Sequence, residues 1–294
     1  MKQIVFISGK GGTGKSTIVA SLSLLVRNKI MADCDVDAPN LHLLLNGKRI
    51  QKNDYYGAEQ AAIDPNKCIS CGQCREVCRF DAITENIEIQ PMKCEGCGAC
   101  AVACPVDAIS LLEVKTGETY VDSTERGTFS HALLDIGAEG SGKLVSEVKE
   151  NLFAFISGEE WAIIDGSPGI GCSVIASITG ADAVVAVCEP TKSGQSDLER
   201  VLKVTQHFSI PAYVCINKHD LNADIAAEIE TYCEENGIPV IGHIPFEPKI
   251  VKALQSFKTP VEAGIEKVAN EIKQLWNRLT TELQNKSERK SINE

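Results

Sequence analysis

The sequence predicts an α/β fold, in which a mostly parallel sheet is flanked by helices and a cysteine-rich module is inserted. Two observations predict the sheet. The apolar run at residues 4–7 leads through a glycine-rich loop into a helix-like segment at residues 18–26, and the apolar run at residues 161–165 ends in an aspartate, where open α/β sheets bind ligands. A third predicts the insertion, because the composition changes abruptly at residue 64. We expect one domain from residues 1–63 and 113–294, and a second from residues 64–112.

The glycine-rich loop has the pattern of a phosphate-binding P-loop. In Gly9-x4-Gly14-Lys15-Ser16, the glycines let backbone N–H groups turn inward around phosphate oxygens. Lys15 is expected to reach the β- and γ-phosphates, and the Ser16 hydroxyl to bind Mg²⁺. A dinucleotide fingerprint fits the same glycines, but Lys15-Ser16 directly after the last one favours a nucleoside triphosphate. The predicted phosphate-binding residues are Gly9, Lys10, Gly11, Gly12, Thr13, Gly14, Lys15, Ser16 and Thr17.

Apolar runs and turn residues predict the other elements in order. Strands are expected at residues 29–33, 119–121, 127–134, 183–187, 211–216 and 240–243. Helices are expected from residue 142 and at residues 196–206, 223–236 and 261–283. The polar stretch at residues 43–62 shows little periodicity and is predicted to be a connector.

Composition narrows the class of protein. The net charge of −11 argues against a nucleic-acid surface, which would be basic. No apolar run approaches the ~20 residues of a membrane span, the C-terminal segment has no large apolar face, and the first strand follows Met1 directly. We therefore expect a cytoplasmic protein without a membrane anchor. Thirteen cysteines without a secretory signal then indicate metal or redox use rather than disulfides.

Eight of the cysteines form two copies of one motif, offset by 26 residues. The spacing Cys-x2-Cys-x2-Cys-x3-Cys is that of a bacterial ferredoxin with two [4Fe–4S] clusters, in which the fourth cysteine binds the other half's cluster. Zinc would use four cysteines in pairs instead. The predicted quartets are Cys68, Cys71, Cys74 and Cys104 for one cluster, and Cys94, Cys97, Cys100 and Cys78 for the second.

One position departs from this pattern. Arg79 follows Cys78 where the ferredoxin motif has proline, as at Pro105. The cysteine ligand is expected to survive this change. We hypothesise that a cation beside the Cys94 cluster makes that cluster the easier one to reduce.

Lys10 makes the P-loop more specific. The run Lys10-Gly-Gly-Thr-Gly-Lys-Ser-Thr17 resembles the deviant Walker A loop of the MinD/ParA superfamily, which includes the nitrogenase iron protein and Mrp-type ATPases. The resemblance implies ATP rather than GTP, and hydrolysis coupled to dimerisation. It also implies that Lys10 reaches across a nucleotide-sandwiched dimer to the partner subunit's phosphates. A solvated loop lysine is the alternative.

The same resemblance implies roles for two aspartates. Asp35, in the first switch and beside Asp33, would orient the attacking water. Asp165 would hold Mg²⁺ through its water shell, and the glycine-rich residues 166–171 would form the second switch. The alternative for the first pair is that these aspartates only cap the next helix. Cys172 is either a residue at a cluster or dimer seam, or a plain thiol that starts a helix.

The resemblance also implies which residues contact the base. In the resembled ATPases, the asparagine at the position of Asn217 contacts adenine, and a loop like that at Pro245 closes over the base. Asn217-Lys218-x-Asp220 also looks like a guanine-reading motif. The deviant P-loop favours adenine.

These expectations combine into one function. The chain is expected to bind ATP/ADP, Mg²⁺ and two [4Fe–4S] clusters, and to couple ATP hydrolysis to electron transfer. The partners implied are a second copy or a similar ATPase, and a redox partner or apo-iron–sulfur protein. Two alternatives stay open: an ATPase that assembles or delivers iron–sulfur clusters, and a redox-sensing, MinD-like regulatory ATPase.

Overall fold

The computed structural model describes residues 1–293, with side-chain burial described up to residue 285. The chain divides into two compact units. The first unit contains Met1–Asn53, Thr119–Leu133 and the chain from Glu139 onward, and the second contains Asp54–Glu118 and Leu134–Ala138. Strands β3 (Gly47–Ile63) and β4 (Ile109–Thr124) belong partly to each unit.

The first unit is built around a mostly parallel sheet, so the predicted α/β class is confirmed. The strand order is β3-β4-β5-β2-β6-β1-β7-β8-β9, and each neighbouring pair from β5 to β9 is parallel. The strands not yet given are β1 (Lys2–Ser8), β2 (Lys29–Asp33), β5 (Gly127–Leu134), β6 (Trp161–Pro168), β7 (Ala183–Cys188), β8 (Ala212–Asn217) and β9 (Val240–Ile244). The central strands are buried along nearly their whole length because both faces of the sheet are covered.

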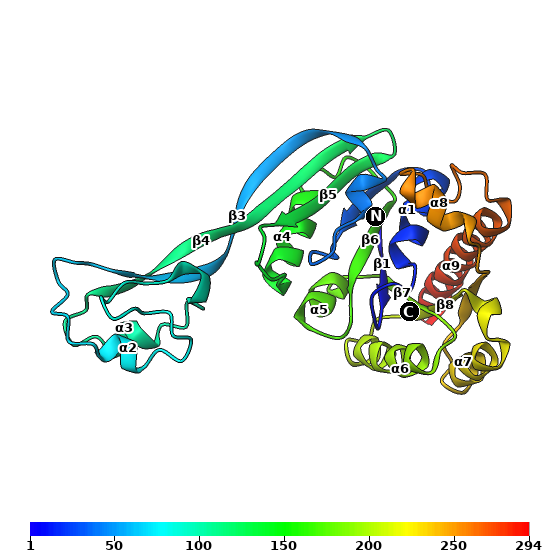
Figure 1. Ribbon diagram of the computed structural model, residues 1–294. Helices are drawn as coiled ribbons and strands as arrows, with labels where there is room; N and C mark the ends of the chain where they lie inside the picture. The colour runs from blue at the N-terminus through cyan, green and yellow to red at the C-terminus, as the bar shows by residue number, and fades with distance from the viewer. Residues whose placement is uncertain (294) are drawn as a thin grey trace. The chain divides into compact units, whose positions relative to one another are not determined.

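Helices cover both faces (Figure 1). On one face, α1 (Lys15–Leu25) and α9 (Glu266–Asn293) pack together, and Ile18 and Leu22 join Ile272 and Leu279 in the core. On the other lie α4 (Gly142–Phe153) and α5 (Cys172–Ile178). The remaining helices are α6 (Lys192–His207), α7 (Ala223–Glu235), α8 (Lys249–Gln255) and the 3₁₀ turns η1 (Leu41–Leu43) and η3 (His219–Leu221). No helix within residues 1–293 is long and apolar enough to cross a membrane.

The prediction of a connector at residues 43–62 is wrong, because most of this stretch is strand β3. Its 17 residues are largely exposed on both faces, so no alternation of apolar and polar residues marks it as a strand. β3 is the edge strand of the sheet and pairs with β4.

The second unit repeats its own backbone at the 26-residue offset. Helix α2 (Gln73–Glu76) begins after Gly72, and α3 (Ala99–Ala103) after Gly98; these glycines have φ of 80° and 76°. A second equivalent pair also has positive φ: 50° at Asp81 and 49° at Asp107. Positive φ is uncommon outside glycine, so its recurrence at equivalent aspartates shows that the two halves adopt the same turn.

Candidate functional site

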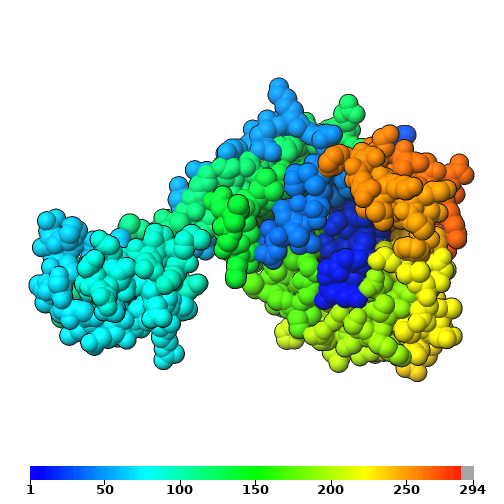
Figure 2. All heavy atoms as spheres, in the orientation of Figure 1, coloured from blue at the N-terminus to red at the C-terminus, as the bar shows by residue number. Residues whose placement is uncertain are grey.

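A cavity of about 540 Å³ lies at the carboxyl ends of β1 and β2 in the first unit. Figure 2 shows the N-terminal segment, in dark blue, exposed at the surface between the segments that follow β2 and precede α9. The volume is in the usual range for small-molecule sites, about 300–1,000 Å³. The lining residues are Ser8, Gly11, Gly12, Thr13, Gly14, Lys15, Ser16, Thr17, Asp35, Asp37, Ala38, Asn40, Leu43, Leu44, Pro168, Leu254 and Phe257.

Most of the predicted phosphate loop therefore faces this cavity. Gly14, with φ of 91°, is the N-cap of α1 and carries no side-chain cap, so the first N–H groups of the helix are available to an anion. A Cβ added at Gly14 would lie 2.2 Å from Nδ2 of Asn217, so only glycine fits there. Gly9 and Lys10, by contrast, do not line the cavity.

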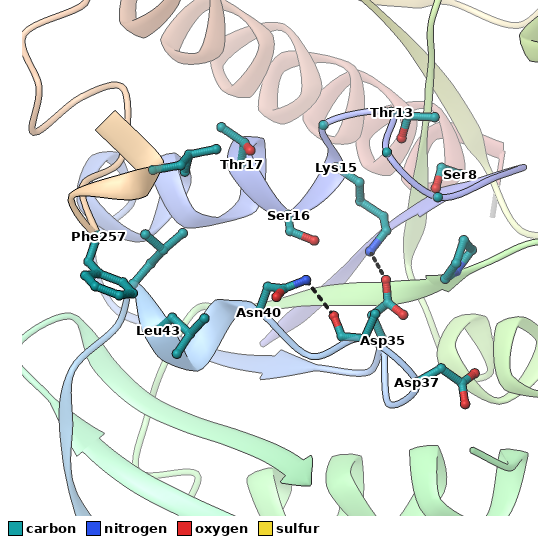
Figure 3. Close-up of a pocket in the computed structure, with 17 residues that line it drawn as sticks. Ser8, Thr13, Lys15, Ser16, Thr17, Asp35, Asp37, Asn40, Leu43 and Phe257 are labelled. Atoms are coloured by element: carbon teal, nitrogen blue, oxygen red, sulfur yellow. Dashed lines mark hydrogen bonds and ion pairs between the residues drawn. The ribbon is translucent and has the colours of Figure 1, made fainter. Parts of the chain in front are cut away.

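Lys15 is buried and lies between two carboxylates. Its Nζ is 3.5 Å from Oδ2 of Asp35 (Figure 3) and 2.6 Å from Oδ1 of Asp165. Burial lowers the pKa of Lys15, but the charges of Asp165 and Asp35 prevail and raise it. The lysine is therefore a fixed positive charge at the wall of the cavity, as neutralisation of phosphate charge requires.

Next to Lys15 and the P-loop, the buried atoms without a hydrogen-bond partner among the described residues include Oγ1 of Thr13 and Oδ2 of Asp165. Leaving such a group unpaired costs roughly 1–3 kcal/mol, so native structures rarely keep one without a ligand or water. A hydrated Mg²⁺ and phosphate oxygens would give both atoms partners. The residues present therefore fit a magnesium–nucleotide complex.

Asp33 orders the loop that carries Asp35. Its carboxylate accepts hydrogen bonds from the backbone N–H groups of Asp35 (3.1 Å), Asn40 (3.2 Å) and Leu41 (3.0 Å). It also lies opposite Asp165 in the register of β2 and β6, and burial together with Asp165 raises its pKa. The capping alternative thus holds for Asp33, whereas Asp35 lines the cavity and faces Lys15.

Lys10 contacts its own chain. Its Nζ is 2.6 Å from Oε1 of Glu189 and donates to Oγ of Ser193 at 3.2 Å. Both partners were missed at the sequence level, because they follow β7, about 180 residues away, and only the pairing of β1 with β7 brings them to the loop. The reach of Lys10 across a dimer stays a prediction.

The two residues predicted to contact the base do not line the cavity. Asn217 is buried and donates to the carbonyl of Thr13 at 2.7 Å, and Pro245 is also buried. The apolar end of the cavity is formed instead by Leu43, Leu44, Leu254 and Phe257, which no sequence motif marks. The base-contact roles of Asn217 and Pro245 therefore stay predictions.

Two cavities of the second unit each have a volume of about 20 Å³. The first is lined by Cys78, Cys94, Cys97 and Cys100, and the second by Cys68, Cys71, Cys74 and Cys104. Each cavity therefore combines three cysteines of one half with the fourth of the other.

Backbone N–H groups point at four of these sulfurs. Ala82 donates to Cys78 at 3.4 Å and Ala108 donates to Cys104 at 3.3 Å, at equivalent places in the repeat. The other two bonds are Ser70 to Cys68 at 3.4 Å and Ala61 to Cys94 at 3.5 Å. Such N–H···S bonds stabilise negative charge on sulfur, as a thiolate ligand requires.

No group of three or more His, Cys, Asp or Glu side chains in the described part of the chain is arranged to hold a single metal ion. A [4Fe–4S] cluster would require a different arrangement, because each cysteine would bind a separate iron atom of the cluster. All thirteen cysteines are free, so none is used in a disulfide. The other five divide as expected: Cys34, Cys188, Cys215 and Cys233 are buried, and Cys172 is exposed as the first residue of α5.

Residues 4–261 match the family model described as the CobQ/CobB/MinD/ParA nucleotide binding domain, and the chain belongs to this family. It is 34% identical over 284 residues to an uncharacterised protein of Methanocaldococcus jannaschii, MJ0578, covering 94% of this chain and 96% of that one. An uncharacterised ATP-binding protein of the same organism, MJ0547, is 26% identical, with 88% and 79% covered.

Solved structures show the same fold. The septum site-determining protein MinD of Pyrococcus horikoshii, complexed with Mg-ADP, superposes with a TM-score of 0.55 at 18% identity, over 93% of both chains. The McdA(D38A)–ATP complex of Cyanothece gives a TM-score of 0.56 at 16% identity, over 95% of this chain and 96% of that one. At these identities the likeness supports the fold alone.

Proposed function

We propose that this chain is an ATPase that couples ATP binding and hydrolysis to electron transfer through two [4Fe–4S] clusters. One observation carries the iron–sulfur half of the proposal: two cavities of the second unit are each lined by four cysteines, three from one half of the repeat and one from the other. This is the arrangement that a two-cluster ferredoxin requires. Membership of the nucleotide-binding family and the P-loop cavity support the ATPase half.

In the nucleotide cavity, each residue takes a role that its position allows. Lys15 would leave its two carboxylates for β- and γ-phosphate oxygens and neutralise their charge. Mg²⁺, held by Ser16 and through water by Asp165, would offset the charge that develops in phosphoryl transfer. Asp35, which Asp33 fixes through its backbone, would accept a hydrogen bond from the attacking water and orient it.

Adenine fits the base side better than guanine. The aspartate of a guanine-reading motif directs its carboxylate at the base. Here Oδ1 of Asp220 already accepts a hydrogen bond from the backbone N–H of Phe246 at 2.7 Å. The aspartate thus fixes the loop after β9, and the lining by Leu43, Leu254 and Phe257 offers apolar surface for a base.

The two clusters would supply one-electron carriers, and the cysteine thiolates would hold them. The nucleotide would act on a dimer, formed with a second copy or a similar ATPase, in which Lys10 contacts the phosphates of the partner subunit. Contacts to the γ-phosphate order switch loops in nucleotide-dependent switches generally, and here the first switch, residues 33–40, leads through η1 into β3. That continuity supports coupling.

Anaerobic purification followed by redox titration tests the proposal. We expect about eight iron atoms and eight sulfides per chain, the content of two [4Fe–4S] clusters. Reduction potentials, followed by electron paramagnetic resonance, should differ between Mg-ADP and a non-hydrolysable ATP analogue. Asp35→Ala should abolish ATP hydrolysis and keep the analogue-induced shift. Cys172→Ala, which changes an exposed cysteine outside both quartets, is the control and should keep all the iron.

Three results would contradict the proposal. Trace iron and sulfide would remove its iron–sulfur half. Full clusters with potentials that no nucleotide changes would remove the coupling. Transfer of labelled iron to an apo-ferredoxin on ATP hydrolysis, with loss of the clusters from this chain, would favour cluster delivery instead.

A further inference from the structure

Three side chains from three neighbouring strand ends meet beside the P-loop. Because β1, β7 and β8 are adjacent and parallel, the residues that follow them lie at one edge of the sheet. Lys10 follows β1, Glu189 follows β7 and Lys218 follows β8. Glu189 lies between the two lysines, with Oε1 2.6 Å from Nζ of Lys10 and Oε2 3.1 Å from Nζ of Lys218.

The carboxylate of Glu189 is held ionised by these contacts. Burial raises its pKa, but the hydrogen bonds from Lys10 and Lys218 outweigh burial and lower the pKa below its ordinary value. Lys218 also donates to the carbonyl of Gly12 at 3.3 Å, so it is fixed to the loop independently of Glu189. If Lys10 left, Glu189 would keep a cation beside it.

Lys10, in turn, has two acceptors on its own subunit. One is Glu189, and the other is Oγ of Ser193 at 3.2 Å, in the first turn of α6. An ammonium group has three donors, and these two acceptors direct it toward the ends of β7 and α6 rather than into the nucleotide cavity, which it does not line. To contact phosphates of another subunit, Lys10 must give up both.

We propose that Glu189 is a latch, a positioning residue that holds Lys10 on its own subunit until a second subunit presents nucleotide phosphates. This rests on the proposed role of Lys10 in the dimer. Glu189 and the partner's phosphate compete for one ammonium group, so the latch weakens nucleotide-dependent dimerisation. Because Lys218 stays with Glu189, release leaves no unpaired carboxylate and the switch is reversible.

The effect of removing the latch follows from the pair's exposure. Lys10 is 32% exposed and Glu189 18%, so the pair belongs with partly exposed ion pairs, whose loss changes an equilibrium about 1.4- to 5-fold. A symmetric dimer releases two latches, so the factor is squared. We expect Glu189→Gln to lower the dimer dissociation constant about 2- to 25-fold in the presence of a non-hydrolysable ATP analogue.

The test is analytical ultracentrifugation of the full chain with Mg²⁺ and that analogue. Glu228→Gln is the matched control, because it removes the carboxylate of the exposed Lys192–Glu228 pair, which also involves α6. It should leave the dimer constant unchanged. In a Lys10→Ala background, Glu189→Gln should no longer tighten the dimer. Ser193→Ala, which removes the second acceptor, should act in the same direction with a smaller factor, and serves if Glu189→Gln does not fold.

Two failures can be told apart. If the wild type dimerises with the analogue and Lys10→Ala does not, but neither Glu189→Gln nor Ser193→Ala tightens the dimer, the latch is wrong and the proposed function stands. If neither the wild type nor Glu189→Gln dimerises with the analogue at any concentration, the dimer function of Lys10 is wrong and the latch is wrong with it.

Discussion

The assignment of the eight cysteines to two cavities makes a prediction that iron counting can test. Cys78 belongs to the first half of the repeat but lines the cavity of Cys94, Cys97 and Cys100. Cys78→Ala should therefore remove the cluster of the second half and leave that of the first. An assignment by sequence neighbourhood would predict the reverse.

The expected iron contents follow from four cysteines per cavity. The wild type should hold about eight iron atoms per chain and Cys78→Ala about four. Adding Cys97→Ala should change nothing further, because both cysteines line one cavity, so the double variant also keeps about four. Adding Cys71→Ala instead removes a ligand of the other cavity, and this double variant should hold almost none.

The assay is anaerobic reconstitution with iron and sulfide, followed by iron determination and electron paramagnetic resonance of the reduced protein. Circular dichroism shows whether each variant is folded. If the Cys78/Cys97 double variant loses all its iron while the Cys78/Cys71 variant keeps about four atoms, Cys78 binds with its own half. Cys78 would then not share a cluster with Cys94, Cys97 and Cys100, contrary to the lining of the cavity.

The first unit yields three further predictions. Lys15→Ala should abolish binding of ATP, measured by calorimetry. It should also lower the free energy of unfolding by about 3–5 kcal/mol, because Asp165 would stay buried without its cation. An unchanged free energy of unfolding in urea would contradict the pairing of Lys15 with Asp165. Gly14→Ala should destabilise the fold by at least 1–2 kcal/mol, because φ of 91° is strained for alanine, whereas Gly171→Ala, with open space and φ of −78°, should stay within about 0.5 kcal/mol. Burial lowers the pKa of His131 to about 4, below its unfolded value of about 6.5. The unfolded chain therefore binds a proton that the folded chain does not, and the free energy of unfolding should fall as the pH drops from about 6.5 toward about 4. In urea titrations, His131→Phe should lose about 3 kcal/mol of that pH dependence.

The sequence predicted the strands that are buried on both faces and missed strand β3, which is largely exposed. Strands β1, β2 and β6 each contain an apolar run because helices cover both faces of the sheet, and such runs are visible in the sequence. β3 has no covered face over most of its length, so nothing in its composition distinguished it from a connector. Its partner β4 begins at Ile109, inside the range first given to the cysteine-rich domain.

The site divides in the same way between local and distant contacts. The P-loop and the aspartates Asp35 and Asp165 were predictable, because their chemistry is fixed by neighbours in the chain or by the end of one strand. Glu189 and Phe257 were not, because they reach the site only through the order of the strands and the return of the chain after β9. No spacing rule connects residues that far apart.

The lining of the two cysteine cavities bears on the effect predicted for Arg79 on the reduction potential. Arg79, in place of proline, suggested that the Cys94 cluster is easier to reduce, but Arg79 is exposed and lines neither cavity. Glu95 does line the Cys94 cavity, and its equivalent in the other half is Ile69. Negative charge near a cluster makes reduction harder, so Glu95 opposes Arg79. Because both charges are exposed and screened by water, we expect a smaller difference between the two reduction potentials than Arg79 alone would produce.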